Sequence, residues 1–241
     1  MESKLFTPVT FGPLTLRNRT IRSAAFESMC PGNAPSDMLL DYHRSVAAGG
    51  IGMTTVAYAA VTQSGLSFDS QLWMRPEIIP GLRRLTDAIH AEGAAAGIQL
   101  GHCGNMSHKS ICGCMPVGAS SGFNLYSPTF VRGLRADELP EMARAYGRSV
   151  NLAREAGFDS VEIHAGHGYL ISQFLSPSTN HRKDEFGGSL QNRMRFMDMV
   201  MEEVMKAAGS DMAVLVKMNK RDGFRGGMEL DETMQVDRRL K

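Results

Sequence analysis

The chain has 241 residues, of which 21% are charged and 43% hydrophobic, and its formal net charge is +1. This composition is typical of a globular protein and excludes a disordered tail, a collagen-like fibre and a disulfide-stapled mini-protein. The near-neutral charge argues against nucleic acid or an acidic membrane as the main partner. No apolar run reaches the roughly 20 residues that a membrane-spanning helix needs, and residues 1–11 lack a secretory pattern. The four cysteines form no disulfide framework. We therefore expect a cytoplasmic protein.

Strand and helix signals alternate along the chain. The apolar residues between 76 and 93 illustrate a helical signal, since Ile78, Leu82, Leu85 and Ile89 are spaced by four, three and four positions. After a small hairpin at 6–17, the predicted elements are, in order, a strand at 20–25, a helix at 37–48 capped by Ser36 and ended by Gly49-Gly50, a strand at 51–57, a helix at 76–93, a strand at 94–100, a helix at 138–156, a strand at 158–164, a helix capped by Ser189, a strand at 213–218 and a helical run from Asp231.

This alternation predicts an α/β fold in which helices cover a parallel sheet. No Gly-x-Gly-x-x-Gly pattern follows the first strand, so a doubly wound dinucleotide-binding sheet is less favoured than a TIM barrel. Only about five strand–helix units can be counted, whereas a complete (β/α)8 barrel has eight. The segment 101–135 is assigned as a long loop, and a loop of this length within a compact domain is usually either functional or wrongly assigned.

Polar side chains gather at the predicted carboxyl ends of three strands. Catalytic groups of a barrel lie at this end, and Gln99 stands near the end of its strand. The apolar residues of the strand at 158–164 are expected to face the helices, which turns Glu162 and His164 inward. The same alternation turns Lys217 inward. An amide, an imidazole and an ammonium group are therefore expected to converge at one barrel mouth.

The spacing of His164 and His167 predicts two imidazoles that can donate to one oxygen and stabilise negative charge that develops on it. Tyr169 adds a phenol that can deliver a proton. This combination suits chemistry at a carbonyl group or its vinylogue. Two alternatives stay open from the residues alone: ordinary structural histidines at a strand end, or a metal site completed by His181 or Cys103.

Three other polar features call for a structural interpretation. An inward-facing Glu162 must be paired or protonated, and Lys217 is the suggested partner. The dense polar stretch 180–193 is expected to be structural, with a glycine turn followed by a capped helix. Cys112 and Cys114, together with Cys103, are a candidate fragment of a metal or iron–sulfur site, although their spacing matches no standard site.

Five groups of residues carry a family resemblance that extends over essentially the whole chain. They are 5–8 with 16–19, 99–104, 162–170, 173–177 and 180–193, of which the last is the densest. With these motifs the sequence resembles the old yellow enzyme family of flavin oxidoreductases, and within it the bacterial enoate and 2,4-dienoyl-CoA reductase branch. The resemblance implies that residues 1–241 are the N-terminal part of a single FMN-binding TIM-barrel domain. The later strands, which hold the FMN phosphate site in this family, are absent from residues 1–241.

The resemblance also implies positions around the flavin. Gln99 would hydrogen-bond the pyrimidine edge of the ring, and Lys217 would place a positive charge near N1 and O2, where many relatives have arginine. Lysine lacks the guanidinium fork, so the geometry there is expected to be looser. The remaining cofactor residues implied by the resemblance are Ala24, Ala25 and Phe26, which would line the flavin by backbone contact, and Ala60 at the same ring system.

The function implied by the resemblance is transfer of hydride from NADH or NADPH, through FMN, to the C=C bond of an α,β-unsaturated carbonyl compound. His164 and His167 would bind the carbonyl oxygen and Tyr169 would protonate the carbon next to the carbonyl. The expected substrate is a small enone or enoyl thioester, with no metal, nucleic acid or membrane involved and a homo-oligomer left open. The alternative is a non-catalytic barrel fragment that binds flavin weakly or not at all and acts at most as an interaction partner.

Overall fold

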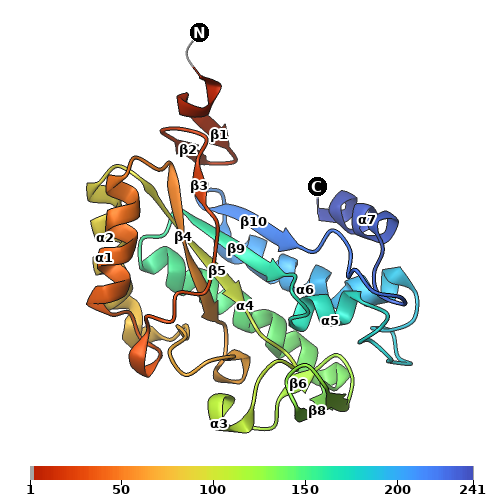
Figure 1. Ribbon diagram of the computed structural model, residues 1–241. Helices are drawn as coiled ribbons and strands as arrows, with labels where there is room; N and C mark the ends of the chain where they lie inside the picture. The colour runs from red at the N-terminus through yellow and green to blue at the C-terminus, as the bar shows by residue number, and fades with distance from the viewer. Residues whose placement is uncertain (1–2, 241) are drawn as a thin grey trace.

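A five-stranded parallel sheet forms the centre of the molecule in the computed structural model, which describes residues 3–240 (Figure 1). The predicted strand–helix alternation and the parallel sheet are confirmed. The sheet is open, with β10 and β3 as its two edges. Its strands, in spatial order, are β10 (Ala213–Met218), β9 (Ser160–Ala165), β5 (Ala95–Gly101), β4 (Met53–Ala60) and β3 (Ile21–Arg22).

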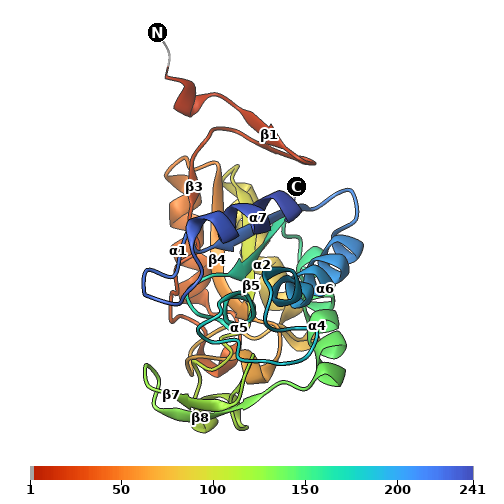
Figure 2. The ribbon, with the colours of Figure 1, turned by 90° about the vertical axis from the view of Figure 1, so that its right-hand side faces the viewer.

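Helices cover the outer face of this sheet, where α1 packs against α2 and α4 against α6 (Figures 1 and 2). Their positions confirm the predicted periodic segments within a few residues. The helices are α1 (Asp37–Ala48), α2 (Ile79–Ala91) after a 3-10 turn at Pro76–Ile78, α3 (Lys109–Cys112), α4 (Leu139–Glu155), α5 (Leu170–Leu175), α6 (Leu190–Ala208) and α7 (Leu230–Leu240). Lys241 lies outside the described residues. Within 3–240, no helix has both the length and the apolar character required to cross a bilayer.

The polar segment 180–193 has the structural role that the sequence predicts. Asn180 Nδ2 donates to the carbonyl oxygens of Phe174 and Phe186, at 2.7 and 2.8 Å. The side chain of Ser189 accepts a hydrogen bond from the backbone of Asn192 and caps α6. The segment therefore fixes the start of α6 and binds it to α5.

Of the two strand pairings at the start of the chain, one agrees with the prediction and the other is shorter than predicted. The hairpin at 6–17 is confirmed as β1 (Val9–Phe11) and β2 (Leu14–Leu16), which project from the body of the molecule (Figure 2). The strand predicted at 20–25 is shorter, because only Ile21 and Arg22 pair with β4. Arg22 Nη1 donates to the backbone oxygen of Thr55 and to Glu27 Oε1, at 2.6 and 2.5 Å, and thereby holds the following residues outside the sheet.

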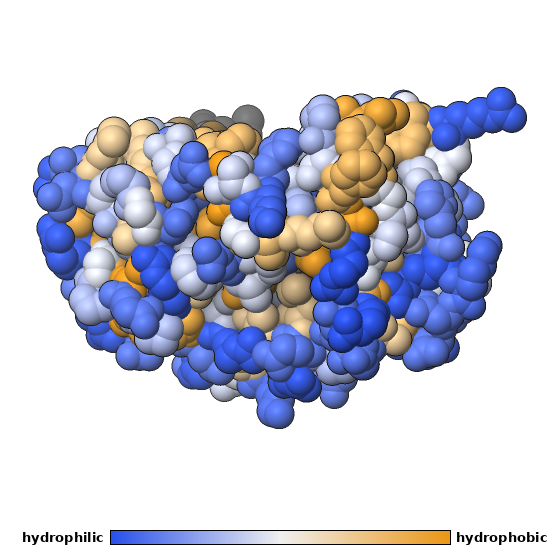
Figure 3. All heavy atoms as spheres, turned by 90° about the horizontal axis from the view of Figure 1, so that it is seen from below, coloured by the Kyte–Doolittle hydropathy of each residue, from blue (hydrophilic) through white to orange (hydrophobic). Residues whose placement is uncertain are grey.

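The long segment 101–135 is a second correction, since it contains elements of its own at the carboxyl end of the sheet. Besides α3 it forms a three-stranded sheet of β6 (Val117–Gly118), β7 (Gly122–Asn124) and β8 (Thr129–Gly133) in the order β6–β8–β7. These strands are too short to show a clear period in sequence. The face of the molecule on which this sheet lies carries apolar side chains interspersed among polar ones (Figure 3).

Candidate functional site

The register of the central sheet brings four polar side chains to one end of its inner face. Gln99 of β5 lies opposite Glu162 of β9, and His164 of β9 lies opposite Lys217 of β10. Paired residues of parallel strands point to the same face. The opposite face of β9 presents Val161 and Ile163, both fully buried in the core. The predicted direction of these side chains is therefore observed.

The partner predicted for Glu162 is wrong. Glu162 Oε1 accepts from Gln99 Nε2 at 2.6 Å, because these two residues are register partners. Lys217 pairs with His164, two residues beyond Glu162 on β9. Its Nζ instead lies 3.2 Å from both Ser23 Oγ and the carbonyl oxygen of Ala24. Lys217 thereby connects edge strand β10 to the residues that follow the other edge strand, β3.

His164 and His167 lie together. Their facing atoms, Nε2 of His164 and Nδ1 of His167, are 3.1 Å apart and the ring centroids 4.9 Å. His164 is buried, whereas His167 is exposed. Burial is the main cause that lowers the pKa of His164 to about 3, and electrostatic interaction with His167 and Lys217 contributes to the same shift. The imidazole of His164 is therefore neutral at physiological pH.

The backbone around the histidine pair is held in an unusual conformation. His167 has a φ of 56°, in the left-handed region that side-chain-bearing residues seldom adopt. Its amide donates to Asn219 Oδ1 at 2.9 Å, from the segment that follows β10. A side chain at Gly166 would approach Asn219 Oδ1 to 2.9 Å, so glycine permits this close approach. Segment 165–169 is therefore fixed by the end of the neighbouring strand.

Tyr169 packs beside the same pair. Its ring centroid lies 4.7 Å from that of His164 and 5.3 Å from that of Tyr58. Burial raises the pKa of the Tyr169 phenol, against the opposite effect of hydrogen bonds with Ser67 and Tyr58. The phenol therefore holds its proton through the physiological pH range and beyond, as a proton donor requires.

The residues expected to line a flavin by backbone contact do not all lie together. Ala24 and Ala60 pack in one small apolar cluster with Tyr58 and Tyr169. Ala60 is fully buried, and its amide donates to the carbonyl oxygen of Leu72 at 2.8 Å. Ala25 and Phe26 are exposed on the extended segment after β3. The ring of Phe26 stacks on that of Phe68, with the ring centroids 4.5 Å apart.

A cavity of about 570 Å³ opens beside the histidine pair. Of the predicted site residues, His167 lines it, and the exposed ring of Tyr126 and the loop residue Phe224 contribute apolar walls. Its sides come from the β6–β8 sheet, from α5 and from the segment between β10 and α7. The segment 101–135 thus supplies one wall of a cavity, as expected of a functional segment.

Sequence reasoning missed two residues that shape this site. Tyr58 donates to Gly65 O and Ser67 Oγ, at 3.0 and 3.1 Å, and supports the ring of Tyr169. It lies near the end of β4, where the register shifts between Val56 and Ala59. The regular alternation of inward and outward side chains therefore does not predict the direction of Tyr58. The second residue, Asn219, directly follows β10. Its position just after the carboxyl end of a strand was the sequence signal that could have identified it as a site residue.

Metal binding finds no support within residues 3–240, where no group of three or more histidine, cysteine or acidic side chains is placed to hold an ion. Among these described residues, the histidine pair has no third ligand beside it. The four cysteines Cys30, Cys103, Cys112 and Cys114 are free thiols, and the last two have their sulfur atoms 4.0 Å apart.

Comparisons with known proteins match nearly the whole chain. The model of the NADH:flavin oxidoreductase / NADH oxidase family matches residues 4–239. The 4,4'-dithiodibutanoate disulfide reductase of Rhodococcus erythropolis is 42% identical over 232 residues, which are 96% of this chain and 58% of that protein. The chain thus spans little more than half the length of this relative.

Two solved structures are similar over nearly the whole chain. A 2-naphthoyl-CoA reductase in complex with 2-naphthoyl-CoA has a TM-score of 0.94 at 28% identity, covering 98% of this chain and 38% of that one. An old yellow enzyme homologue from Zymomonas mobilis has a TM-score of 0.89 at 27% identity, covering 99% and 70%. The predicted resemblance to the old yellow enzyme family and the partial TIM-barrel fold are therefore confirmed.

Proposed function

Because the chain belongs to the NADH:flavin oxidoreductase / NADH oxidase family, we propose that it carries the catalytic side chains of an FMN-dependent oxidoreductase that reduces the C=C bond of an α,β-unsaturated carbonyl compound. The family uses FMN as cofactor and NAD(P)H as reductant. The observation that carries the proposal is the histidine pair: His164 and His167 are 3.1 Å apart at a cavity, with the ring of Tyr169 beside them.

The side chains at the carboxyl end of the sheet fit the isoalloxazine ring of FMN. Within residues 3–240, the side chain of Gln99 uses one N–H in its hydrogen bond to Glu162, so its second N–H and its oxygen suit the pyrimidine edge. In the same part of the chain Lys217 contacts only neutral oxygens and makes no ion pair. Its uncompensated charge suits the edge of the ring at N1 and O2, where reduction adds negative charge. Ala24, Ala25, Phe26 and Ala60 are retained in the proposal as backbone contacts of the ring.

Bound FMN would supply the hydride chemistry, from NAD(P)H to the β-carbon of the substrate. The chain's own contribution is to hold and polarise the carbonyl group. The amide of Gly166 donates to Nδ1 of His164 at 3.3 Å, so the proton of this neutral ring is on Nε2. Nε2 faces Nδ1 of His167 at 3.1 Å, and a carbonyl oxygen that lies beside the two rings and replaces this contact would accept from both. Enolate-like charge on that oxygen is then stabilised by two fixed donors.

Tyr169 completes the reaction by providing the proton for the carbon next to the carbonyl. Its raised pKa keeps the phenol protonated until the substrate carbon becomes basic. The neutral state of His164 leaves Tyr169 as the acid of the site, because a neutral imidazole is a weaker proton donor than a phenol. Lys217 would offset the charge of the reduced cofactor and is not required to move a proton.

The cavity supports a flat, conjugated substrate, either a small enone or an enoyl thioester. Aromatic side chains from two different segments line it, among them Phe123, Tyr126 and Phe224. A cavity of about 570 Å³ lies within the range of about 300–1,000 Å³ that is usual for small-molecule sites. A cytoplasmic location and the choice between NADH and NADPH stay predictions.

The purified chain tests the proposal directly. We expect it to bind FMN, seen as a yellow absorbance that co-elutes with the protein, and to oxidise NADH or NADPH without oxygen when 2-cyclohexenone is added. Cyclohexanone should form in equal amount. A chain that stays colourless after incubation with FMN would instead support the non-catalytic fragment. Bound flavin that NAD(P)H reduces, but that never reduces the enone, would reject the role of the histidine pair.

A further inference from the structure

A pair of thiols lies at the lower rim of the molecule, outside the proposed catalytic residues. Cys112 is the last residue of α3, and Gly113 follows with a φ of 75°. This left-handed glycine reverses the chain at the end of the helix, so that Cys114 folds back on Cys112. Their sulfur atoms are 4.0 Å apart, and Cys112 Sγ also lies 3.3 Å from the carbonyl oxygen of Cys114.

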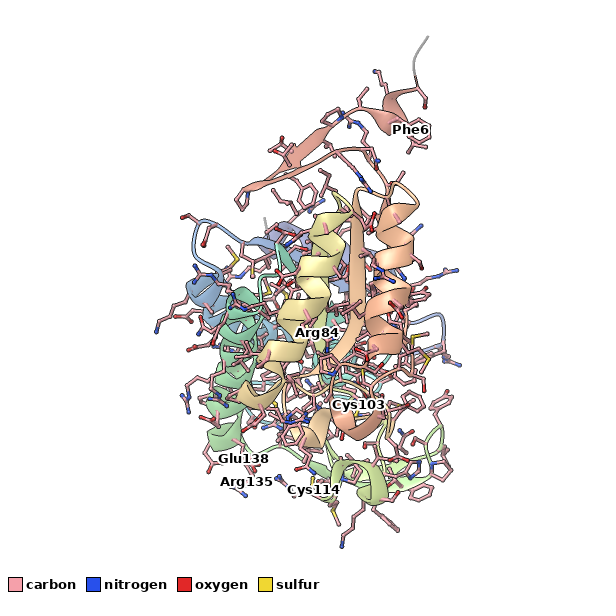
Figure 4. All side chains as sticks on the ribbon, turned by 90° about the vertical axis from the view of Figure 1, so that its left-hand side faces the viewer. Phe6, Arg84, Cys103, Cys114, Arg135 and Glu138 are labelled. Atoms are coloured by element: carbon pink, nitrogen blue, oxygen red, sulfur yellow. The ribbon has the colours of Figure 1, made fainter. Side chains whose placement is uncertain are left out.

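The two thiols differ in access. Cys112 is 2% exposed, whereas Cys114 is exposed to solvent. In Figure 4 Cys114 lies at the rim, and Cys103 lies inside the body of the molecule. A disulfide requires a sulfur–sulfur distance of about 2.05 Å, and rotation of the exposed Cys114 side chain can close this gap. Partial burial raises the pKa of Cys114, and Cys112 adds to this, whereas Arg132 opposes it.

We propose that Cys112 and Cys114 form a thiol–disulfide exchange site that takes a small organic disulfide as its oxidant. The exposed Cys114 thiolate attacks one sulfur of the disulfide, its S–S bond breaks and one thiol leaves with a proton. Cys112 then attacks Cys114 in the mixed disulfide and releases the second thiol. The balance is two protein thiols oxidised to one disulfide and one external disulfide reduced to two thiols.

Two observations restrict the proposed exchange to Cys112 and Cys114 and exclude the other two cysteines. Cys103 is fully buried, and its Sγ lies 3.4 Å from the carbonyl oxygen of Leu66, so an external disulfide has no access to it. Cys30 is buried in the main core, away from α3. Metal binding is a weaker reading of the pair, because among residues 3–240 no third histidine, cysteine or acidic group is placed to complete a site with it.

The experiment treats the folded chain with glutathione disulfide at mildly alkaline pH, which offsets the raised pKa of Cys114. Trypsin then releases the pair in one peptide, 110–132, whereas Cys103 and Cys30 fall in the separate peptides 85–109 and 23–44. We expect peptide 110–132 to be lighter by two hydrogen atoms and to carry no glutathione. Dithiothreitol should restore its mass, and the other two peptides should keep free thiols.

Two variants separate the roles of the thiols. Cys112→Ser should retain glutathione on Cys114, because the resolving thiol is missing, and Cys114→Ser should stay unmodified. Cys103→Ser is the matched control and should behave as the wild type. A wild-type chain that accumulates stable glutathione on Cys114, stays fully reduced, or oxidises Cys30 and Cys103 at the same rate would overturn the proposal, and none of these outcomes depends on flavin or on enone turnover.

Discussion

The two faces of β9 differ in the kind of side chain that they carry. On the outer face, Val161 and Ile163 are fully buried among the helices. On the inner face, Glu162 and His164 make polar contacts with residues of other segments. Successive side chains of one strand thus serve separate purposes, since the outer residues stabilise the fold and the inner ones are available for chemistry. Substitutions on the two faces should have separable effects on stability and on activity.

The largest expected effect is on activity, from the inner face. His164→Ala combined with His167→Ala removes both proposed donors to the carbonyl oxygen. Since one such donor contributes about 10²–10³-fold to rate, we expect kcat/KM for an enone to fall by about 10⁴-fold or more, while NAD(P)H still reduces the flavin. Steady-state and stopped-flow absorbance measure the two steps. His90→Asn, on the surface, is the control, and enone turnover that survives the double substitution would remove both histidines from the mechanism.

On the outer face, Ile163→Ala should lower stability and leave the site's residues in place. Loss of a fully buried isoleucine side chain costs about 2–5 kcal/mol. Urea unfolding followed by circular dichroism measures the difference. Glu162→Gln, one residue away but inward-facing and half-buried, should cost less than half as much. Equal losses in the two variants would contradict the division between the faces of β9.

The pH dependence of stability tests the buried imidazoles of the inner side. Burial lowers the pKa of both His164 and His102 to about 3. Between pH 6.5 and 3 the unfolded chain binds protons that the folded chain does not, so stability falls as pH falls, by about 2 kcal/mol per imidazole from pH 6.5 to 5. Above pH 6.5 this contribution is complete. Asp159 raises the pKa of His90, which acts in the opposite direction.

Unfolding free energies at pH 7 and pH 5 measure this effect. His102→Gln should reduce the difference between the two pH values by about half, because one of the two imidazoles whose pKa is lowered to about 3 is gone. Acid-induced loss that His102→Gln leaves unchanged would show that the imidazole of His102 titrates in the folded chain as it does in the unfolded one.

The smallest expected effect concerns the start of α6, one of the helices that cover the outer face of the sheet and pack against α4. Ser189→Ala removes the side-chain acceptor that caps this helix and should cost about 1 kcal/mol. Thermal unfolding is sensitive enough to detect this. Ser210→Ala, just beyond the other end of α6, should change stability by less than about 0.5 kcal/mol. A larger effect at Ser210 than at Ser189 would contradict the assigned cap.

Much of the fold follows from local signals that the sequence displays. The strand at 213–218 and the helix at 37–48 were predicted to the residue, because Ser36 and Gly49-Gly50 mark the ends of that helix. The short strands within 101–135 could not be predicted, since two to five residues give no measurable period. The end of β3 depends on the contacts of Arg22 with Glu27 and Thr55, which no local pattern reveals.

The contacts of the candidate site also divide into those that local sequence predicts and those that it does not. The meeting of His164 and His167 follows from their spacing at a strand end, which local sequence contains. The partner of Glu162 depends on the register between β5 and β9, which residues 63 positions apart determine together. Strand alternation predicts that Lys217 faces inward, but not that its side chain reaches the segment after β3. Tertiary register is therefore the information that single-strand reasoning lacks.

The hydrogen bond from the amide of His167 to Asn219 has a consequence for how such a site can diversify. His167 occupies its left-handed conformation with support from a residue 52 positions away. The segment that begins at Asn219 also lines the cavity, at Asp222 and Phe224. Changes in that one segment can therefore remodel the cavity wall and tilt an imidazole in a single step. Substrate preference can drift in this way while both histidines are retained.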